Sequence, residues 1–376
     1  MNHSDDRLMV VTVNSGSTSI KLAAWHAVAS GAAERLAHEQ QSGAQLQPDV
    51  ILSAFLQRLA AAPDVLVHRV VHGGTRFTAP VRLDESALQE IERLSELAPL
   101  HNPKALEWIG AARRCVPQQV AQVAAFDTAW FAQLPRVAAE YALAARYGVD
   151  EGVRRYGFHG IAHESLWHQW AQLHPQLTGG GRLITLQLGG GCSAAAICDG
   201  RPLDTTMGFS PLEGLMMGTR SGDVDPAIVP YLQRRLAMTS DEIIDLLNRS
   251  SGISGMADGQ TDLGKLAADP SPRSQFVVEL FSYRVRKTIG AYLAVLGGCD
   301  GIVFGGGIGE HVPAVRQRIL HSLQWVGIQL DESANEAARG ETARISSPAS
   351  AIAVHVIPTD EESVLVRAAR RCFQAA

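Results

Sequence analysis

Two copies of one pattern constrain the fold of this chain most: an apolar run, a turn of small residues and a second apolar run. The first copy spans residues 8–25 around the turn NSGSTS, and the second spans residues 183–198 around the turn GGGCS. Short apolar runs bounded by turn residues are typical of buried strands. Ser17 and Ser193, in the two turns, are 176 positions apart. This spacing predicts two related halves rather than an array of short repeats.

The length and the predicted elements favour an α/β protein of two domains. A chain of 376 residues is long enough for two domains or one elaborate domain. A boundary is expected near residues 129–135, and because no low-complexity linker separates the halves, we expect them to pack around a cleft. The other predicted strands are 65–71, 120–126 and 301–304, the last followed by a glycine turn at 305–309, and the predicted helices are 49–62, 84–97 and 163–173.

Composition excludes several classes of protein. A net charge of −5, from 33 basic and 38 acidic residues, argues against a protein that coats nucleic acid. The first residues are acidic and lack the apolar core of a secretion signal. The most apolar long window, residues 288–309, contains Asp300 and eight glycines, which makes it a poor membrane span. Five cysteines without a CxxC pair favour reduced thiols. We therefore expect a cytoplasmic enzyme with neither nucleic acid nor membrane as its partner.

The first turn and the lysine that follows it, NSGSTSIK over residues 14–21, have the composition of a phosphate-binding loop. Small residues let successive backbone amides converge on an anion, and the hydroxyl groups add donors. Lys21 adds a positive charge, although the GxxxxGK[ST] pattern of a P-loop is absent. An ordinary hairpin turn explains the same residues, but the two further Gly-rich turns favour phosphate binding.

Two arginines and one histidine lie beside glycines. Arg69, in HRVVHGG, ends a predicted strand and can hold a carboxylate or a phosphate with two hydrogen bonds. Val71 lies on the same face of that strand and can wall an apolar pocket. His159, in YGFHG, and Arg220, in MGTRSGD, suit an anionic transition state. The alternatives are a surface ion pair for an arginine and a neutral core residue for the histidine.

Two sets of carboxylates are further candidates for ligand binding. Asp127 comes directly after a buried strand, and such strand ends commonly line the ligand crevice of α/β sheets. The segment PTDEE at residues 358–362 offers hard oxygen ligands for Mg²⁺. A helix cap is the alternative for both, with Thr359 and Glu362 forming a capping pair in the second.

Ordered segments along almost the whole chain carry a resemblance to a known family. They are VNSGSTSIK, HRVVHGG, LAPLHNP, FDTAW, RRYGFHG, TTMGFSPLEGLMMGTRSGDVDP, GIGE and IPTDEE. Over residues 10–371 the chain resembles the acetate and propionate kinase family. The resemblance implies homodimers with the duplicated, ribonuclease H-like fold of the actin-like ATPase and sugar-kinase superfamily and an active site in the interdomain cleft. It implies an N-terminal domain at 1–130, completed by a C-terminal helix at 361–376, and a nucleotide-binding domain at 131–360.

The same resemblance implies a reaction. The γ-phosphoryl group of ATP passes reversibly and directly to acetate, giving acetyl phosphate and ADP, with Mg²⁺ as the metal and Mn²⁺ as an alternative. Arg69 and Arg220 correspond to a clamp on the carboxylate and the phosphoryl group. His159 corresponds to a stabiliser of the transition state, and Asp127 to an acid or base.

Three groups of binding residues follow from the resemblance. The metal and phosphate positions are Asn14, Glu361, Ser17, Ser19 and Lys21. The apolar pocket for the acetate methyl group comprises Val71, Leu100, Phe158 and Pro211. The nucleotide-contacting positions are Gln187, Leu188, Gly189, Gly190, Gly191, Asp262, Leu263, Gly264, Gly307, Ile308, Gly309, Glu310 and His311.

Acid–base chemistry gives Asp127 a different role from the one that the resemblance implies. The pKa of a carboxyl group lies about 3 units below neutral pH, so the acceptor is already deprotonated. Its attack therefore needs no general base. We predict that Asp127 orients a Mg²⁺-bound water or an arginine instead of moving a proton.

Departures from the family pattern cluster in the nucleotide loops. Gly190 stands where an amide side chain is usual, Gln187 replaces a histidine, Gly264 an arginine and His311 an asparagine. ATP is the expected donor, and small residues at Gly264 and Gly307 leave space for adenosine. The alternatives are propionate as acceptor, another phosphoryl donor, a nucleotide-gated actin-like binding protein, or an inactive paralogue.

Overall fold

The computed structural model describes residues 7–16, 19–28, 33–43 and 46–374, and the chain forms two compact units. Unit 1 comprises Met1–Ala132, His159–Ile161 and Asp360–Ala376, and unit 2 comprises Gln133–Phe158 and Ala162–Thr359. Each unit contains one six-stranded sheet within the described residues.

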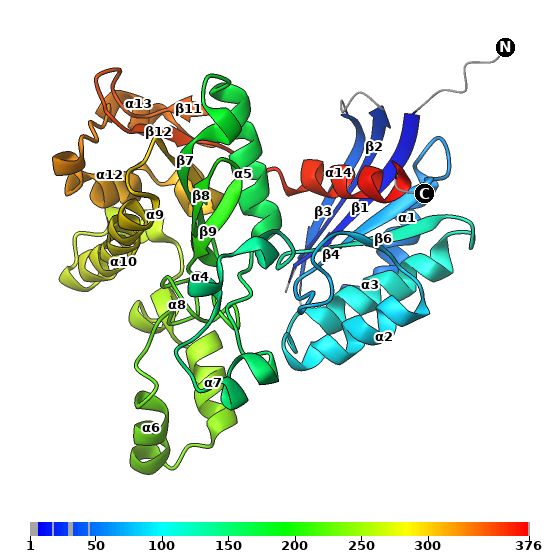
Figure 1. The fold of residues 1–376 in the computed structure, drawn as a ribbon, viewed down its shortest axis with the longest axis horizontal. Helices are drawn as coiled ribbons and strands as arrows, with labels where there is room; N and C mark the ends of the chain where they lie inside the picture. The colour runs from blue at the N-terminus through cyan, green and yellow to red at the C-terminus, as the bar shows by residue number, and fades with distance from the viewer. Residues whose placement is uncertain (1–6, 17–18, 29–32, 44–45, 375–376) are drawn as a thin grey trace. The chain divides into compact units, whose positions relative to one another are not determined.

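The sheet of unit 1 combines an antiparallel hairpin with parallel strands. Its strands are β1 (Arg7–Ser15), β2 (Ser19–Val28), β3 (Ala33–Ser42), β4 (Val65–Val70), β5 (Val81–Arg82) and β6 (Ala121–Phe126). Their order is β3-β2-β1-β4-β6-β5, with β4 parallel to β1 and β6 parallel to β4 (Figure 1). The polar ends of β1, β4 and β6 therefore meet at one edge of this sheet.

Helices cover both faces of this sheet. They are α1 (Pro48–Gln57), α2 (Glu85–Arg93), α3 (Asn102–Cys115) and the C-terminal α14 (Glu361–Gln374). Successive residues of a strand point to opposite faces. Val10 of β1 accordingly packs with Leu365 of α14, whereas Val11 packs with Phe55 of α1 and Trp108 of α3. The last helix of the chain thus completes the core formed by its first strands.

The sheet of unit 2 repeats this topology. Its strands are β7 (Arg182–Leu188), β8 (Cys192–Cys198), β9 (Arg201–Thr205), β10 (Gly301–Gly305), β11 (Ala343–Arg344) and β12 (Ala353–Val356). Written as β9-β8-β7-β10-β12-β11, the order and direction of pairing match those of unit 1 strand for strand. The predicted duplicated α/β fold is confirmed.

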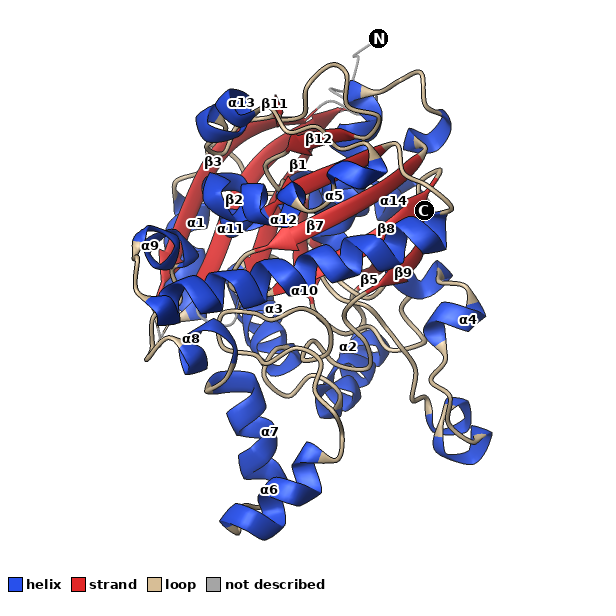
Figure 2. Ribbon diagram, turned by 90° about the vertical axis from the view of Figure 1, so that its left-hand side faces the viewer, coloured by secondary structure: helices blue, strands red, loops and turns tan. Residues whose placement is uncertain are grey.

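Unit 2 carries most of the helices within the described residues. They are α4 (Arg136–Ala139), α5 (Gly160–Leu173), α6 (Ile228–Leu236), α7 (Ser240–Arg249), α8 (Gly252–Met256), α9 (Leu263–Ala268), α10 (Pro272–Leu296), α11 (Gly306–His311), α12 (Pro313–His321) and α13 (Glu332–Ala337). The long helix α10 lies along the sheet (Figure 2). None of the described helices is long and apolar enough to cross a membrane.

Two local predictions were wrong. The glycine turn expected at 305–309 is the start of α11, because Gly306 adopts a left-handed φ of 74° and its amide donates to the Glu310 carboxylate at 2.7 Å. At α14 the Asp360 carboxylate accepts from the Ser363 amide at 3.1 Å, so Asp360 supplies the cap that the sequence suggested for Thr359. The Asp84 carboxylate caps α2 by accepting from the Ala87 amide.

Candidate active site

Four predicted site residues of unit 1 meet at the end of its parallel strands. Asn14 lies near the end of β1, Arg69 near the end of β4, and Asp127 directly after β6. Glu361 is the first residue of α14, which packs against β1 and β4. The parallel pairing of β1, β4 and β6 brings these ends side by side, as the sequence predicted for Asp127.

Arg69 lies at the centre of this group. Its Nε and Nη2 donate to the Asp127 carboxylate at 2.7–3.2 Å, and its Nη1 donates to Asn14 Oδ1 at 3.2 Å. The same Nη1 lies 3.4 Å from Glu361 Oε2, which also accepts from Asn14 Nδ2 at 2.7 Å. The guanidinium is therefore held in one orientation by charge-assisted hydrogen bonds.

Burial and charge act against each other in this group. Burial disfavours the charged form of Arg69, but the carboxylates of Asp127 and Glu361 raise the pKa of its guanidinium above the ordinary value. Burial raises the pKa of Asp127, opposed by the charge of Arg69. Burial also disfavours ionised Glu361, yet Arg69, the hydrogen bond from Asn14 and the charge of Lys21 lower its pKa. Removing the charge of Arg69 would leave the buried Asp127 carboxylate without its ion-pair partner.

The predicted phosphate loop borders the same group. Lys21, on β2, is the cross-strand partner of Asn14. Ser19 begins β2, and its carbonyl accepts from the Gly16 amide at 2.8 Å, which closes the turn as a hairpin. Ser17 lies outside the described residues. The hairpin alternative is thus correct for the backbone, and the phosphate role of Lys21 stays a prediction.

His159 lies next to Asp127 because a backbone hydrogen bond joins the following residue, Gly160, to Asp127. The Gly160 amide donates to the Asp127 carbonyl at 3.0 Å, and a Cβ at Gly160 would lie 2.2 Å from that oxygen. His159 itself has a left-handed φ of 58°. Such a conformation costs about 1–3 kcal/mol in a residue other than glycine and is concentrated at functional sites.

In unit 2, Arg220 is a half-buried guanidinium of a different kind. Its Nη1 donates to the Pro211 carbonyl at 3.1 Å and lies 3.6 Å from Met217 Sδ. Within the part of the chain that the structure describes, no carboxylate pairs with it, and burial lowers its pKa. A desolvated arginine without a counter-ion is suited to an anionic ligand.

Two of the predicted nucleotide positions face open space. A Cβ added at Gly190 or at Gly307 would meet no atom within 4 Å, and one at Gly189 would lie 3.8 Å from the Gly307 nitrogen. The β7–β8 turn and the start of α11 therefore border the same region. The Gly190 carbonyl also accepts from the Gly218 amide at 2.9 Å, which ties this turn to the loop of Arg220.

Other residues predicted to contact the nucleotide have structural roles in unit 2. The Asp262 carboxylate caps α9, and the Glu310 carboxylate accepts from the Gly306 and Thr359 amides at 2.7 and 3.1 Å. His311 Nδ1 bonds to the Arg339 carbonyl at 3.0 Å. Three further side chains are committed as well: Leu188 and Leu263 are buried, and Gln187 Oε1 accepts from the Thr359 hydroxyl. The backbone amide of Gly264 donates to the Asp262 carboxylate.

The four residues predicted for the methyl pocket differ in burial. Phe158 is buried, Val71 and Pro211 are half-buried, and Leu100 is exposed. Val71 and Leu100 belong to unit 1, and Phe158 and Pro211 to unit 2. Their joint role stays a prediction.

Sequence reasoning missed two polar residues beside these sites, the half-buried Thr359 and the buried Asn102. The Thr359 hydroxyl donates to Gln187 Oε1 at 2.8 Å and accepts from the Gly306 amide at 3.2 Å, joining β7 to α11. Asn102 is fully buried at the start of α3. The only available signal was their place inside quoted motifs, IPTDEE and LAPLHNP.

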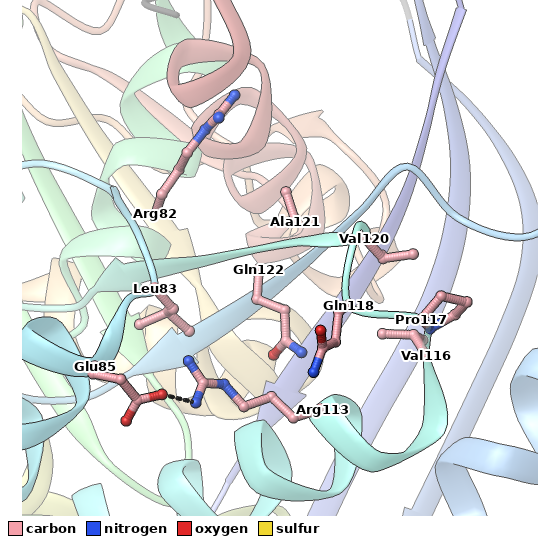
Figure 3. Close-up of a pocket in the computed structure, with 10 residues that line it drawn as sticks. All are labelled: Arg82, Leu83, Glu85, Arg113, Val116, Pro117, Gln118, Val120, Ala121 and Gln122. Carbon is pink, nitrogen blue, oxygen red and sulfur yellow. Dashed lines mark hydrogen bonds and ion pairs between the residues drawn. The ribbon is translucent and has the colours of Figure 1, made fainter.

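A separate hollow of about 460 Å³ lies in unit 1 (Figure 3). Its lining combines residues of β5, the end of α3 and the start of β6, among them Arg82, Arg113 and Gln122. Asp127 follows the opposite end of β6. None of the predicted site residues lines this hollow, so it is distinct from the candidate site.

The duplicated sheets, with the arginine–carboxylate group at the strand ends of unit 1, give an α/β protein with the fold of the actin-like ATPase and sugar-kinase superfamily. A family model described as the acetokinase family matches residues 32–367. The chain belongs to the acetokinase family.

Individual relatives agree with this assignment. The chain is 43% identical over 310 residues to an acetate kinase of Chloroherpeton thalassium, covering 81% of this chain and 74% of that protein. It is 41% identical over 387 residues to an acetate kinase of Clavibacter sepedonicus, covering 96% and 98%. Among solved structures, a propionate kinase from Francisella tularensis has a TM-score of 0.85 at 32% identity, covering 96% and 98%. An acetate kinase of Porphyromonas gingivalis has a TM-score of 0.84 at 30% identity, covering 97% and 100%.

Proposed function

We propose that this chain catalyses the reversible transfer of the γ-phosphoryl group of ATP to acetate, giving acetyl phosphate and ADP. Membership of the acetokinase family supports the reaction class. The observation that carries the proposal is Arg69, a guanidinium only 14% exposed and fixed by the Asp127 and Glu361 carboxylates at the ends of parallel strands. A group oriented in this way can bind a carboxylate or a phosphoryl oxygen with little reorganisation.

Phosphoryl transfer to acetate requires neutralisation of negative charge more than it requires proton transfer. Acetate is deprotonated at neutral pH, and the transferred phosphoryl group passes through an in-line, metaphosphate-like transition state. We propose that Arg69 and Arg220 stabilise its negative charge and that His159 donates a hydrogen bond to it. Asp127 orients Arg69, which its contacts of 2.7–3.2 Å support.

The residues at the end of β1 and the start of α14 fit a divalent metal carried by a nucleotide. No group of three His, Cys, Asp or Glu side chains in the described ranges is arranged to hold a metal alone. Mg²⁺ bound to phosphates needs only one or two protein ligands. Glu361, whose pKa is lowered against the effect of burial, and Asn14 would supply these oxygens for Mg²⁺ or Mn²⁺. The metal, when bound, neutralises phosphate charge.

We propose ATP as the donor, bound by unit 2. The open space beside Gly190 and Gly307 supports a nucleotide there, because neither residue carries a side chain into it. The segment 262–264 at the start of α9 borders α12, since a Cβ at Gly264 would lie 3.8 Å from Val312.

Propionate is the second candidate acceptor, supported by the structural similarity to a propionate kinase. Hydroxylamine trapping of acyl phosphate tests both acceptors at once. Acetate and propionate would each be tried against ATP, GTP and pyrophosphate, with and without Mg²⁺. Formation of product from acetate and ATP supports the proposal. Product from another pair would assign a different acceptor or donor. Folded protein that forms no product with any pair overturns the proposal.

Gly160→Ala is expected to impair the site through the backbone. The new Cβ would clash with the Asp127 carbonyl oxygen at 2.2 Å, so His159 and Asp127 must separate. A displacement of about 1 Å can cost 10²-fold in rate, and we expect kcat to fall by about that factor. Steady-state kinetics measure it, with Gly290→Ala on α10 as control, because a Cβ there meets nothing within 4 Å. Wild-type turnover in Gly160→Ala would show that the contact has no role.

We further propose a cytoplasmic homodimer. The cysteines are all free thiols, as expected in a reducing compartment. Helix α6 contains no buried residue and exposes Ile228, Tyr231 and Leu236, the last two by 57% and 59%. An amphipathic helix of this kind is suited to a partner surface.

Tyr231→Glu is therefore expected to convert the dimer to a monomer, because it places a charge on the apolar face of α6. Sedimentation velocity would measure the change. Trp325→Glu, at another exposed apolar residue, is the control and should leave the dimer intact. A wild-type protein that sediments as a monomer would contradict the proposal.

A further inference from the structure

Asn102 clamps the backbone of a residue next to the candidate acyl pocket. The His72 amide donates to Asn102 Oδ1 at 3.1 Å, and Asn102 Nδ2 donates to the His72 carbonyl at 3.0 Å. The Asn102 side chain is fully buried, with a further contact of 3.5 Å to the Ile91 carbonyl. A buried amide that satisfies both backbone groups of one residue fixes that residue closely.

The turn that follows His72 is held in the same way. The Gly73 amide donates to the Thr128 hydroxyl at 3.0 Å, and the Gly74 amide donates to His72 Nδ1 at 3.0 Å. The Gly73 carbonyl accepts from the Phe77 amide at 3.0 Å. Three successive backbone amides, from 72 to 74, thus each have a side-chain partner.

These hydrogen bonds connect the two segments of unit 1 that carry predicted pocket residues. Val71 precedes His72 directly, and Arg69 lies two residues earlier. Leu100 lies two residues before Asn102. The Asn102 amide therefore joins the segment of Val71 to the segment of Leu100. Its hydrogen bonds go to backbone groups and not to the side chain of Val71 or Leu100.

We infer that Asn102 is a positioning residue that fixes Val71 relative to Leu100 and thereby sets the size of the pocket for the acyl acceptor. The inference rests on the proposed function. Thr128 supports the same turn from the end of β6 through Gly73. The chain length of the carboxylate that the pocket accepts is then set partly by Asn102 and Thr128, two buried polar side chains outside the pocket.

Asn102→Ala tests this inference, together with Thr128→Val, which keeps the shape of the side chain and removes the hydroxyl. Loss of a buried hydrogen-bond partner is expected to raise the KM for acetate about tenfold or more. The KM for ATP should stay within about twofold, since the nucleotide residues lie elsewhere. The ratio of kcat/KM between acetate and propionate should shift by about tenfold, because one methylene is discriminated by about 10–200-fold in a shaped pocket.

Asn248→Ala is the matched control, since its amide makes a solvent-exposed hydrogen bond of 2.9 Å to one backbone carbonyl of its own helix, α7. A residue with a merely structural role would lower Tm and the active fraction while leaving the KM for acetate and the acceptor ratio unchanged. Unchanged values in folded Asn102→Ala, or in Thr128→Val if the first variant does not fold, overturn the inference. A wild-type protein that forms no acyl phosphate overturns the proposed function instead.

Discussion

Arg220→Ala is expected to lower kcat by about 10³–10⁵-fold, the range for an arginine that stabilises the transition state of phosphoryl transfer. The structure gives the reason. The Arg220 guanidinium is half-buried, donates to the Pro211 carbonyl and has no carboxylate partner among the described residues. Its charge is therefore available to a ligand, whereas the charge of Arg69 is shared with Asp127 and Glu361.

Arg220→Lys should remain closer to the alanine variant than to the wild type, because an ammonium group lacks the planar fork of donors. Arg249→Ala is a suitable control, since that side chain is exposed and forms an ion pair with Asp245 on its own helix. Its turnover should not change. Near-wild-type kcat in folded Arg220→Ala would remove Arg220 from the mechanism.

Asp127→Asn is expected to lower kcat/KM for acetate by about 10²-fold or more, comparable to the loss of one preorganised donor in an active site. The amide keeps the size of the side chain but turns an N–H group toward the Arg69 guanidinium. Arg69 then loses the two-oxygen contact that orients it. Steady-state kinetics with acetate as the varied substrate would measure the change.

The pH dependence of this variant separates two roles of Asp127. Because the acceptor is already ionised, an orienting carboxylate leaves the shape of the pH–rate profile unchanged when it is replaced by an amide. We expect the profiles of the wild type and of Asp127→Asn to differ in height only. Loss of a titrating limb in the variant would show that Asp127 transfers a proton.

The duplicated fold and the group around Arg69 could be predicted from local sequence. The two strand–turn–strand patterns correspond to β1–β2 and β7–β8, and both sheets pair in the same order. Arg69 and Asp127 follow buried apolar runs, and the ends of parallel strands converge. Glu361 could be placed only through the family motif, because nothing local shows that α14 returns to β1.

Other features depend on contacts that no local pattern reports. The glycines at 305–309 look like a turn, yet Glu310 bonds to the Gly306 amide and a helix forms. Asp262 carries a carboxylate in a predicted nucleotide loop, but that group caps α9. Asn102 lies in the quoted motif beside Leu100, and its contact with His72 spans 30 positions of the chain. Such long-range hydrogen bonds are fixed by the tertiary fold.

Phosphorus NMR of the wild-type protein with ATP, Mg²⁺ and acetate tests the central claim most directly. The proposed reaction predicts that the γ-phosphate resonance of ATP declines while an acetyl phosphate resonance grows by the same amount. Omitting acetate should abolish both changes. Growth of inorganic phosphate alone, independent of acetate, would contradict the proposal and indicate a nucleotide-hydrolysing switch of the actin-like fold.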